Sequence, residues 1–142
     1  ATCERQPLVA VYSKDTTQRQ KMERELSKIA WSDQFIGQAQ YVAVQETSDF
    51  KAVKGLKAKP GFIVIQPGQF GLTGKVIGEI GPEAKAAKLK DGVAEALGKH
   101  KPSQLTYEQH RQAGRQAGAR WKSATPNTDG LSRRGGSRRP RR

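Results

Sequence analysis

Cysteine is almost missing from this chain of 142 residues, in which Cys3 is the only one. A single cysteine cannot form a disulfide within its own chain. Because neither histidine lies near it in the sequence, we expect no zinc site and no other bound metal. Cys3 is therefore either a spare thiol near the start of the chain or an intermolecular thiol. In the second case it would bond to another chain or to a cofactor, which an oxidising compartment would permit.

Long apolar runs are missing as well. No stretch approaches the length of about 18 apolar residues that a membrane-spanning helix needs, so we expect no transmembrane segment. The printed sequence begins at Ala1, which suits either cleavage of a signal peptide or removal of an initiator methionine. Cleavage would place the protein in the periplasm or outside the cell, and we favour this over the cytoplasm.

Acidic residues are scarce in the last third of the chain. Residues 101–142 hold 11 Lys and Arg against Glu108 and Asp129, a net charge of +9, whereas residues 1–100 carry a net charge of +4. This division predicts an N-terminal segment (1–6), a folded domain (7–100) and a basic, Arg-rich extension (101–142). A charge distribution of this kind gives information about what a protein binds, not about its fold. It predicts an acidic partner.

The folded part alternates strand and helix patterns. Short apolar runs predict strands at 8–12, 41–44, 61–65 and 75–80. Amphipathic spacing predicts a helix with Met22, Leu26 and Ile29 on its apolar face, and a second helix after Pro82 that ends at Gly98. Residues 49–53 fit a short helix closed by a glycine. We therefore expect an α/β fold with a four-stranded mixed sheet and helices on both of its faces.

This order of elements resembles the thioredoxin family. The resemblance spans about Pro7 to Gly98 and is carried by Leu8–Tyr12 before the first long helix and by Ala58–Ile65, which contains Pro60. The family has a cis-proline at the position of Pro60, so the resemblance implies a cis bond between Lys59 and Pro60. It also implies a Cys-x-x-Cys pair at the start of the first long helix.

That pair is absent here. Thr16 and Arg19 stand near the two cysteine positions, and neither residue can form a thiolate. Asp15, Thr16 and Thr17 could either cap the helix or bind an anion at its N-terminus. Because no nucleophile, base and orienting group come together in the sequence, we expect no catalytic residues, no cofactor and no enzymatic activity.

The extension divides into two parts. Residues 106–122 fit a helix that places Arg111 and Arg115 one turn apart, with Gly114 and Gly118 on a second stripe; a frayed linker is the alternative. Residues 123–142 predict an irregular tail. The candidate partner-binding residues are Arg111, Arg115, Arg120, Trp121, Arg133, Arg134, Arg138, Arg139, Arg141 and Arg142.

Two hypotheses about function follow from the extension. In the first, the protein is a non-catalytic, thioredoxin-like subunit of a larger assembly and docks on acidic protein surfaces. In the second, the Arg/Gly-rich tail binds the phosphate backbone of nucleic acid, or another polyanion. A redox accessory role that uses Cys3 alone is a third and weaker alternative.

Overall fold

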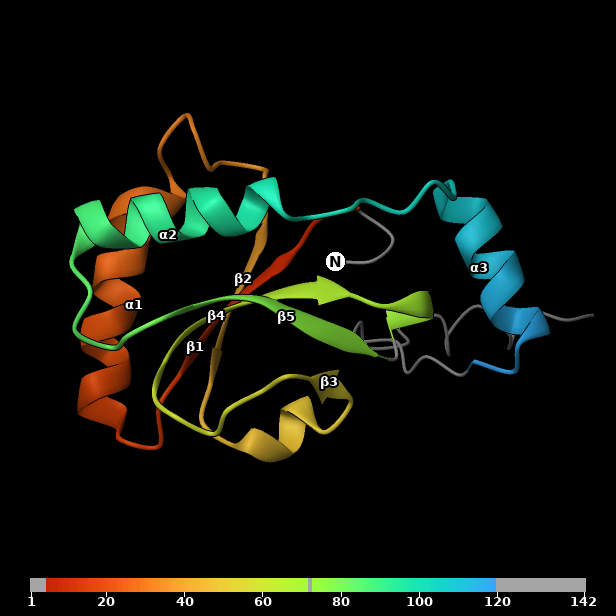
Figure 1. Cartoon of the computed structure of the whole chain (residues 1–142). Coiled ribbons are helices and arrows are strands. Elements are labelled where there is room, and N and C mark those ends of the chain that lie inside the picture. Colours follow the sequence, from red (N-terminus) through yellow and green to blue (C-terminus); the bar gives the residue numbers. More distant parts are fainter. Residues whose placement is uncertain (1–4, 72, 120–142) are drawn as a thin grey trace, which may run out of the picture.

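The computed structural model describes residues 5–71 and 73–119 (Figure 1). It is an α/β structure with a mixed sheet of five strands and three α-helices in the described residues. The elements in chain order are β1 (Leu8–Tyr12), α1 (Thr16–Ala30), β2 (Gln40–Val44), η1 (Thr47–Phe50), β3 (Val53–Lys54), β4 (Gly61–Pro67), η2 (Gln69–Gly71), β5 (Gly74–Ile80), α2 (Ala86–Gly98) and α3 (Tyr107–Gln116).

The sheet has the strand order β2-β1-β4-β5-β3. α1 connects β1 to the parallel strand β2, and β4 runs antiparallel to both β1 and β5. A register shift lies between Val64 and Ile65 in the β4–β5 ladder. The predictions of an α/β fold and of a mixed sheet are therefore confirmed.

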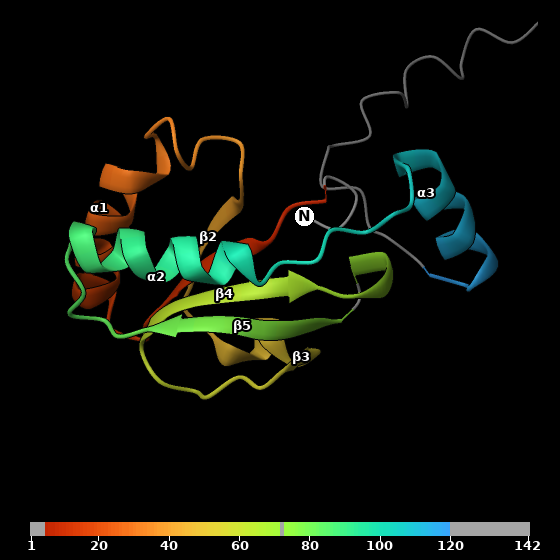
Figure 2. The ribbon, with the colours of Figure 1, turned by 45° about the horizontal axis from the view of Figure 1, so that its top comes forward.

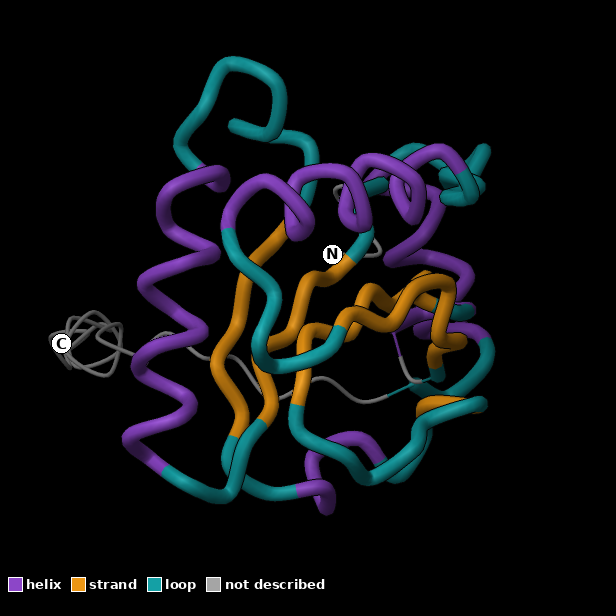
Figure 3. The backbone as a smooth tube through the Cα atoms, turned by 60° about the vertical axis from the view of Figure 1, so that its left-hand side comes forward, coloured by secondary structure: helices purple, strands orange, loops and turns teal. Residues whose placement is uncertain are grey.

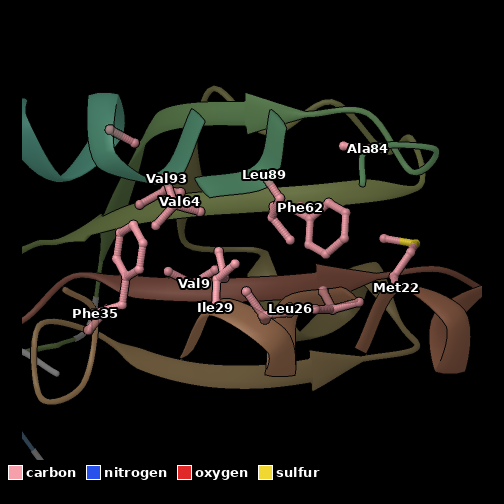
Figure 4. Packing of buried hydrophobic residues seen from close by; sticks show 13 residues of the cluster. Val9, Met22, Leu26, Ile29, Phe35, Phe62, Val64, Ala84, Leu89 and Val93 are labelled. Atoms are coloured by element: carbon pink, nitrogen blue, oxygen red, sulfur yellow. The ribbon is translucent and has the colours of Figure 1, made fainter. Parts of the chain in front are cut away.

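One face of the sheet packs against α1 and α2. α1 begins after Asp15, whose carboxylate accepts a hydrogen bond from the Thr17 amide at 2.9 Å. Figure 4 shows side chains of α1 and α2 meeting those of β1 and β4 in a single layer. The cluster consists of Val9, Val11, Met22, Leu26, Ile29, Phe35, Ala39, Phe62, Val64, Ala84, Leu89, Val93 and Ala96. Burial of each large apolar side chain in it stabilises the fold by about 1.5–3 kcal/mol.

The opposite face is covered by η1 and the segment after it. Phe50, from the end of η1, is buried against Tyr12 and Ile63, and the partly buried Val53 and Leu56 pack against this second cluster. Figure 3 shows the sheet between the two long helices and the short helical turn of η1. The expectation of helices on both faces is therefore met on this side only by one turn of 3₁₀-helix.

Two details differ from the sequence-based prediction. The sheet has a fifth strand, β3, because the helical turn already ends at Phe50 and Val53 pairs with Gly74 of β5. The Lys59–Pro60 bond is trans, so the expectation of a cis bond is wrong. A trans X–Pro bond is preferred by about 0.5–1 kcal/mol unless the surroundings select the other isomer.

α1 and α2 are joined at the N-terminus of α2. Lys85, the N-cap residue of α2, makes no capping hydrogen bond with its side chain. Instead, Glu25 of α1 accepts a hydrogen bond from the Ala86 amide at 3.1 Å and forms an ion pair with Lys28 at 2.6 Å. The hydrogen bond from Lys28 holds the pKa of Glu25 below its ordinary value, and the Ala86 amide adds to this effect against the opposing effect of desolvation.

Candidate cationic docking face

The described part of the basic extension contains the helix α3. Thr106 and Gln109 form a capping box in which the Gln109 amide donates to the Thr106 hydroxyl at 3.3 Å and the Thr106 amide donates to the Gln109 side chain at 2.9 Å. The helix ends at Gln116 because Gly118 has a positive φ of 74°. The amides of Gly118 and Ala119 then donate to the carbonyls of Arg115 and Gly114, a Schellman arrangement.

This C-terminal turn alters the expected surface of the helix. The predicted helix over 106–122 has the expected start, and its helical turns stop at Gln116. Gly118 lies beyond the helix, so the expected stripe of Gly114 and Gly118 does not form along it. Of the two glycines, only Gly114 lies within the helix, where it is buried.

α3 rests on the hairpin loop between β4 and β5, at the end of the molecule opposite α1 (Figures 1 and 2). The His110 ring lies 5.5 Å from the Phe70 ring, measured between centroids, with the planes tilted by 56°. His110 is only 3% exposed, and neither of its ring nitrogens has a hydrogen-bond partner in the described structure. The imidazole therefore anchors the helix through ring packing.

The segment between α2 and α3 is held to the core by hydrogen bonds. Gln66 at the end of β4 accepts from the Lys101 amide at 2.8 Å and donates to the Lys101 carbonyl at 2.6 Å. The two ring nitrogens of His100 lie 3.0 Å from the Gln66 side-chain oxygen and 3.0 Å from the Arg5 carbonyl. Both partners are acceptors, so a neutral ring can make one of these bonds and a protonated ring both. Arg5 in turn donates from Nε and Nη2 to the Leu105 carbonyl at 3.2 and 3.1 Å.

The outward side of α3 carries an aromatic ring followed by two arginines at intervals of four residues. Tyr107 is 55% exposed, and the guanidinium carbon of Arg111 lies 5.6 Å from the centroid of its ring. Glu108 reaches Arg111 at 3.5 Å, and Arg115 is exposed one turn further along. We call Tyr107, Arg111 and Arg115 the α3 face.

The remaining predicted partner-binding residues cannot be placed on this face. Arg120, Trp121, Arg133, Arg134, Arg138, Arg139, Arg141 and Arg142 lie outside the described residues, as does Cys3. The structure therefore brings together two of the ten predicted residues, Arg111 and Arg115, on one described helix.

By the resemblance, three positions of this chain correspond to the active site of thioredoxins. All three lie at one end of the sheet. Thr16 and Arg19 are at the start of α1, which follows β1, and Pro60 precedes Gly61, the residue paired with Tyr12 at the end of β1. Arg19 donates to the Ser13 carbonyl at 3.2 Å and lies 3.5 Å from Glu23.

The capping interpretation of this helix start is confirmed by the hydrogen bond of Asp15, whose carboxylate sits where an anion would bind. Pro60 lines a pocket of about 320 Å³ together with Lys57, Lys59 and Glu79.

Neither a metal site nor a membrane helix is found in the described structure. Across residues 5–71 and 73–119, no three His, Cys, Asp or Glu side chains are grouped so that they could hold a metal ion. No helix in these ranges is long and apolar enough to cross a membrane.

Sequence reasoning missed the residues that fix α3 in place. Arg5 and Leu105 are 100 positions apart, and Gln66 and Lys101 are 35 apart, so no local pattern indicates either contact. The only local signal was Thr106 with Gln109, which follows the capping-box pattern.

No family model, curated protein or solved structure matches the chain.

Proposed function

We propose that the protein is a non-catalytic, thioredoxin-like accessory subunit that docks on an acidic protein surface through the α3 face and the Arg-rich residues after it. The observation that carries this proposal is the fixed position of α3. A cationic helix that floated on a linker would lose conformational entropy on binding, whereas a helix already packed on Phe70 loses less.

The thioredoxin-like part of the proposal rests on the order of elements. The α1 crossover between β1 and β2, the β4–β5 hairpin and the following helix α2 agree with the order on which the resemblance is based. Without cysteines at positions 16 and 19, such a core retains a binding role rather than thiol chemistry. The trans bond at Pro60 is a further departure from the family.

The acidic partner is supported by the chemistry of the exposed groups. Guanidinium groups bind carboxylates in a bidentate way, and tyrosine is enriched in interface cores. Within α3 only Glu108 opposes Arg111 and Arg115, and its contact with Arg111 is long at 3.5 Å. Exposed pairs of this kind contribute little, so an external carboxylate can replace Glu108 at low cost.

Nucleic acid is the second candidate, and one observation favours it. The exposed Tyr107 ring beside Arg111 is a suitable platform for stacking an unpaired base. Binding of that kind depends strongly on salt, with a log–log slope of about −0.7 for each phosphate contacted on a single strand.

The test compares two probes with one pair of variants. Binding of poly-L-glutamate and of a 20-nucleotide single-stranded DNA is measured by fluorescence anisotropy on the full chain. Arg111→Glu/Arg115→Glu reverses the α3 face. Lys88→Glu/Lys90→Glu makes the same change of charge on exposed residues of α2 and serves as the control.

We expect poly-L-glutamate to bind and the α3 variant to weaken it about tenfold, equivalent to ~1.4 kcal/mol, while the α2 variant has a much smaller effect. Equal effects of both variants would mean that net charge alone is responsible and would refute the role of the α3 face. Tighter binding of DNA, together with partners that nuclease releases from a native-source pulldown, would favour the second candidate.

A further inference from the structure

An apolar groove runs along β2 at the edge of the sheet that α3 does not reach. It has a volume of about 400 Å³ and lies between the later turns of α1, the connection to β2, and β2 itself. Leu26, Ser27 and Ala30 line it from α1, and Tyr41 and Ala43 line it from β2. Glu23 is the one ionic residue in its lining.

Large apolar side chains are exposed around this groove. Trp31 is 77% exposed, Ile36 52% and Val42 38%. Of the large hydrophobic residues that are exposed in the described structure, only Leu105 and Tyr107 lie elsewhere. A gathering of exposed apolar groups on one side of a polar, charged protein marks an interaction surface.

No Lys or Arg lines the groove, although the chain has 26 Lys and Arg, and Arg19, which pairs with the lining residue Glu23 at 3.5 Å, is largely buried. No Lys or Arg occurs between Lys28 and Lys51, a stretch that includes Trp31, Ile36 and all of β2. The two sides of α1 differ in charge in the same way. Its groove side presents Glu23, Ser27 and Ala30, while Lys21, Arg24 and Lys28 line a different pocket beside α2.

β2 is also an unprotected edge strand. It pairs with β1 on one side, and on its other side no described strand pairs with it. Its sequence, Gln-Tyr-Val-Ala-Val, has neither a charge nor a proline, the residues that usually prevent pairing of edge strands. The opposite edge differs, because β3 has only two residues and one of them is Lys54.

We infer that a second copy of this chain binds at this groove, with the two β2 strands pairing antiparallel about a two-fold axis at Val42. Two molecules of net charge +13 repel each other over most of their surfaces, whereas neither the lining of this groove nor β2 contains a Lys or Arg. A two-fold contact requires one patch to complement itself, which an uncharged strand beside an apolar groove does. Trp31 and Ile36 of each copy then cover the groove of the other.

The inference does not depend on the proposed function. A dimer would present two α3 faces, but its formation involves none of Tyr107, Arg111 and Arg115. Failure of one proposal therefore leaves the other unaffected.

The test is the oligomeric state of the nuclease-treated full chain, measured by analytical ultracentrifugation from 1 to 200 µM. We expect a monomer–dimer equilibrium, and Val42→Lys should raise the dimer dissociation constant about tenfold or more, because two lysines would meet at the axis and the burial of two valines would be lost. Ala52→Lys adds the same charge at an exposed position near the opposite edge and should change nothing. A wild-type chain that stays monomeric at 200 µM would overturn the inference, as would equal effects of the two variants.

A cross-linking experiment tests the register and does not require a destabilised dimer. In a Cys3→Ser background, Val42→Cys should form a disulfide-linked dimer much faster than Ala52→Cys, because paired residues at the axis bring their Cβ atoms close enough to bond. Equal rates would refute pairing at Val42. A chain ending at Ala119 should dimerise like the full chain; loss of the dimer on this truncation would instead identify the C-terminal segment as the occupant and overturn the proposal.

Discussion

Replacing Gly78 by alanine should disturb the contact between α2 and the sheet. Gly78 lies in β5, where a Cβ atom would be 2.6 Å from the Cβ of Ala96 and 3.6 Å from that of Val64. Ala96 is 1% exposed, and its methyl group is attached directly to the helix backbone. It cannot rotate away, so α2 must shift by about 1 Å to restore an ordinary contact distance of ~3.5–4 Å.

The expected loss of stability is the difference between two effects. Overpacking in a close-packed interior costs about 1–3 kcal/mol. Replacement of glycine by alanine reduces the entropy of the unfolded chain and returns about 0.4–1 kcal/mol. Gly78→Ala should therefore lower the free energy of unfolding by about 1–2 kcal/mol, measured by urea denaturation with an unchanged m-value.

Gly98→Ala is the matched control, because a Cβ there has no heavy atom within 4 Å. It removes a glycine from the last position of α2 and should leave stability unchanged or raise it by up to about 1 kcal/mol. Adding Ala96→Gly to Gly78→Ala should make the double variant more stable than the sum of the two single changes predicts. A Gly78→Ala protein as stable as the wild type, or a strictly additive pair, would refute this account of the α2 contact.

Two further predictions concern helix termini. Because the folded pKa of Glu25 lies below its ordinary value, its contribution to stability is present at neutral pH and is lost as the pH falls through that folded pKa. Glu25→Gln should therefore be less stable than the wild type in urea at pH 7, and this difference should shrink as the pH is lowered through the acid range. A difference that stays constant with pH would contradict the role of its charge. Thr106→Ala removes the N-cap of α3 and should weaken that helix by about 1 kcal/mol. Amide hydrogen exchange in Tyr107–Gln116 should then be about fivefold faster, while exchange in α2 stays unchanged. Equal acceleration in both helices would show that α3 opens only with the whole domain.

Local patterns in the sequence were sufficient to predict the main strands and helices. The run Leu8–Tyr12 predicted β1 without error, and the spacing of Met22, Leu26 and Ile29 predicted the buried side of α1. These features depend on residues within one element, where period and side-chain type determine which face is buried. β3 was missed because two residues form no pattern, and Val53 becomes part of a strand only through its pairing with Gly74 of β5.

The candidate surfaces were less accessible to sequence reasoning. The pair Arg111 and Arg115 could be predicted because four residues make one helical turn. The packing of His110 on Phe70 could not, since it joins segments separated by the whole of β5 and α2. The absence of Lys and Arg around β2 was visible in the sequence, but its meaning required the knowledge that β2 forms an edge.

The hydrogen bonds from Arg5 to Leu105 connect positions that are synthesised 100 residues apart. During translation, the first of these partners leaves the ribosome long before the second exists, and Gln66 must also be in its strand before His100 and Lys101 can be held. Placement of α3 is therefore a late event in the life of each new chain. A full-length but half-folded molecule has the same arginines but lacks the support that orients them, so correct presentation of the α3 face reports that Arg5 and the end of β4 are in place.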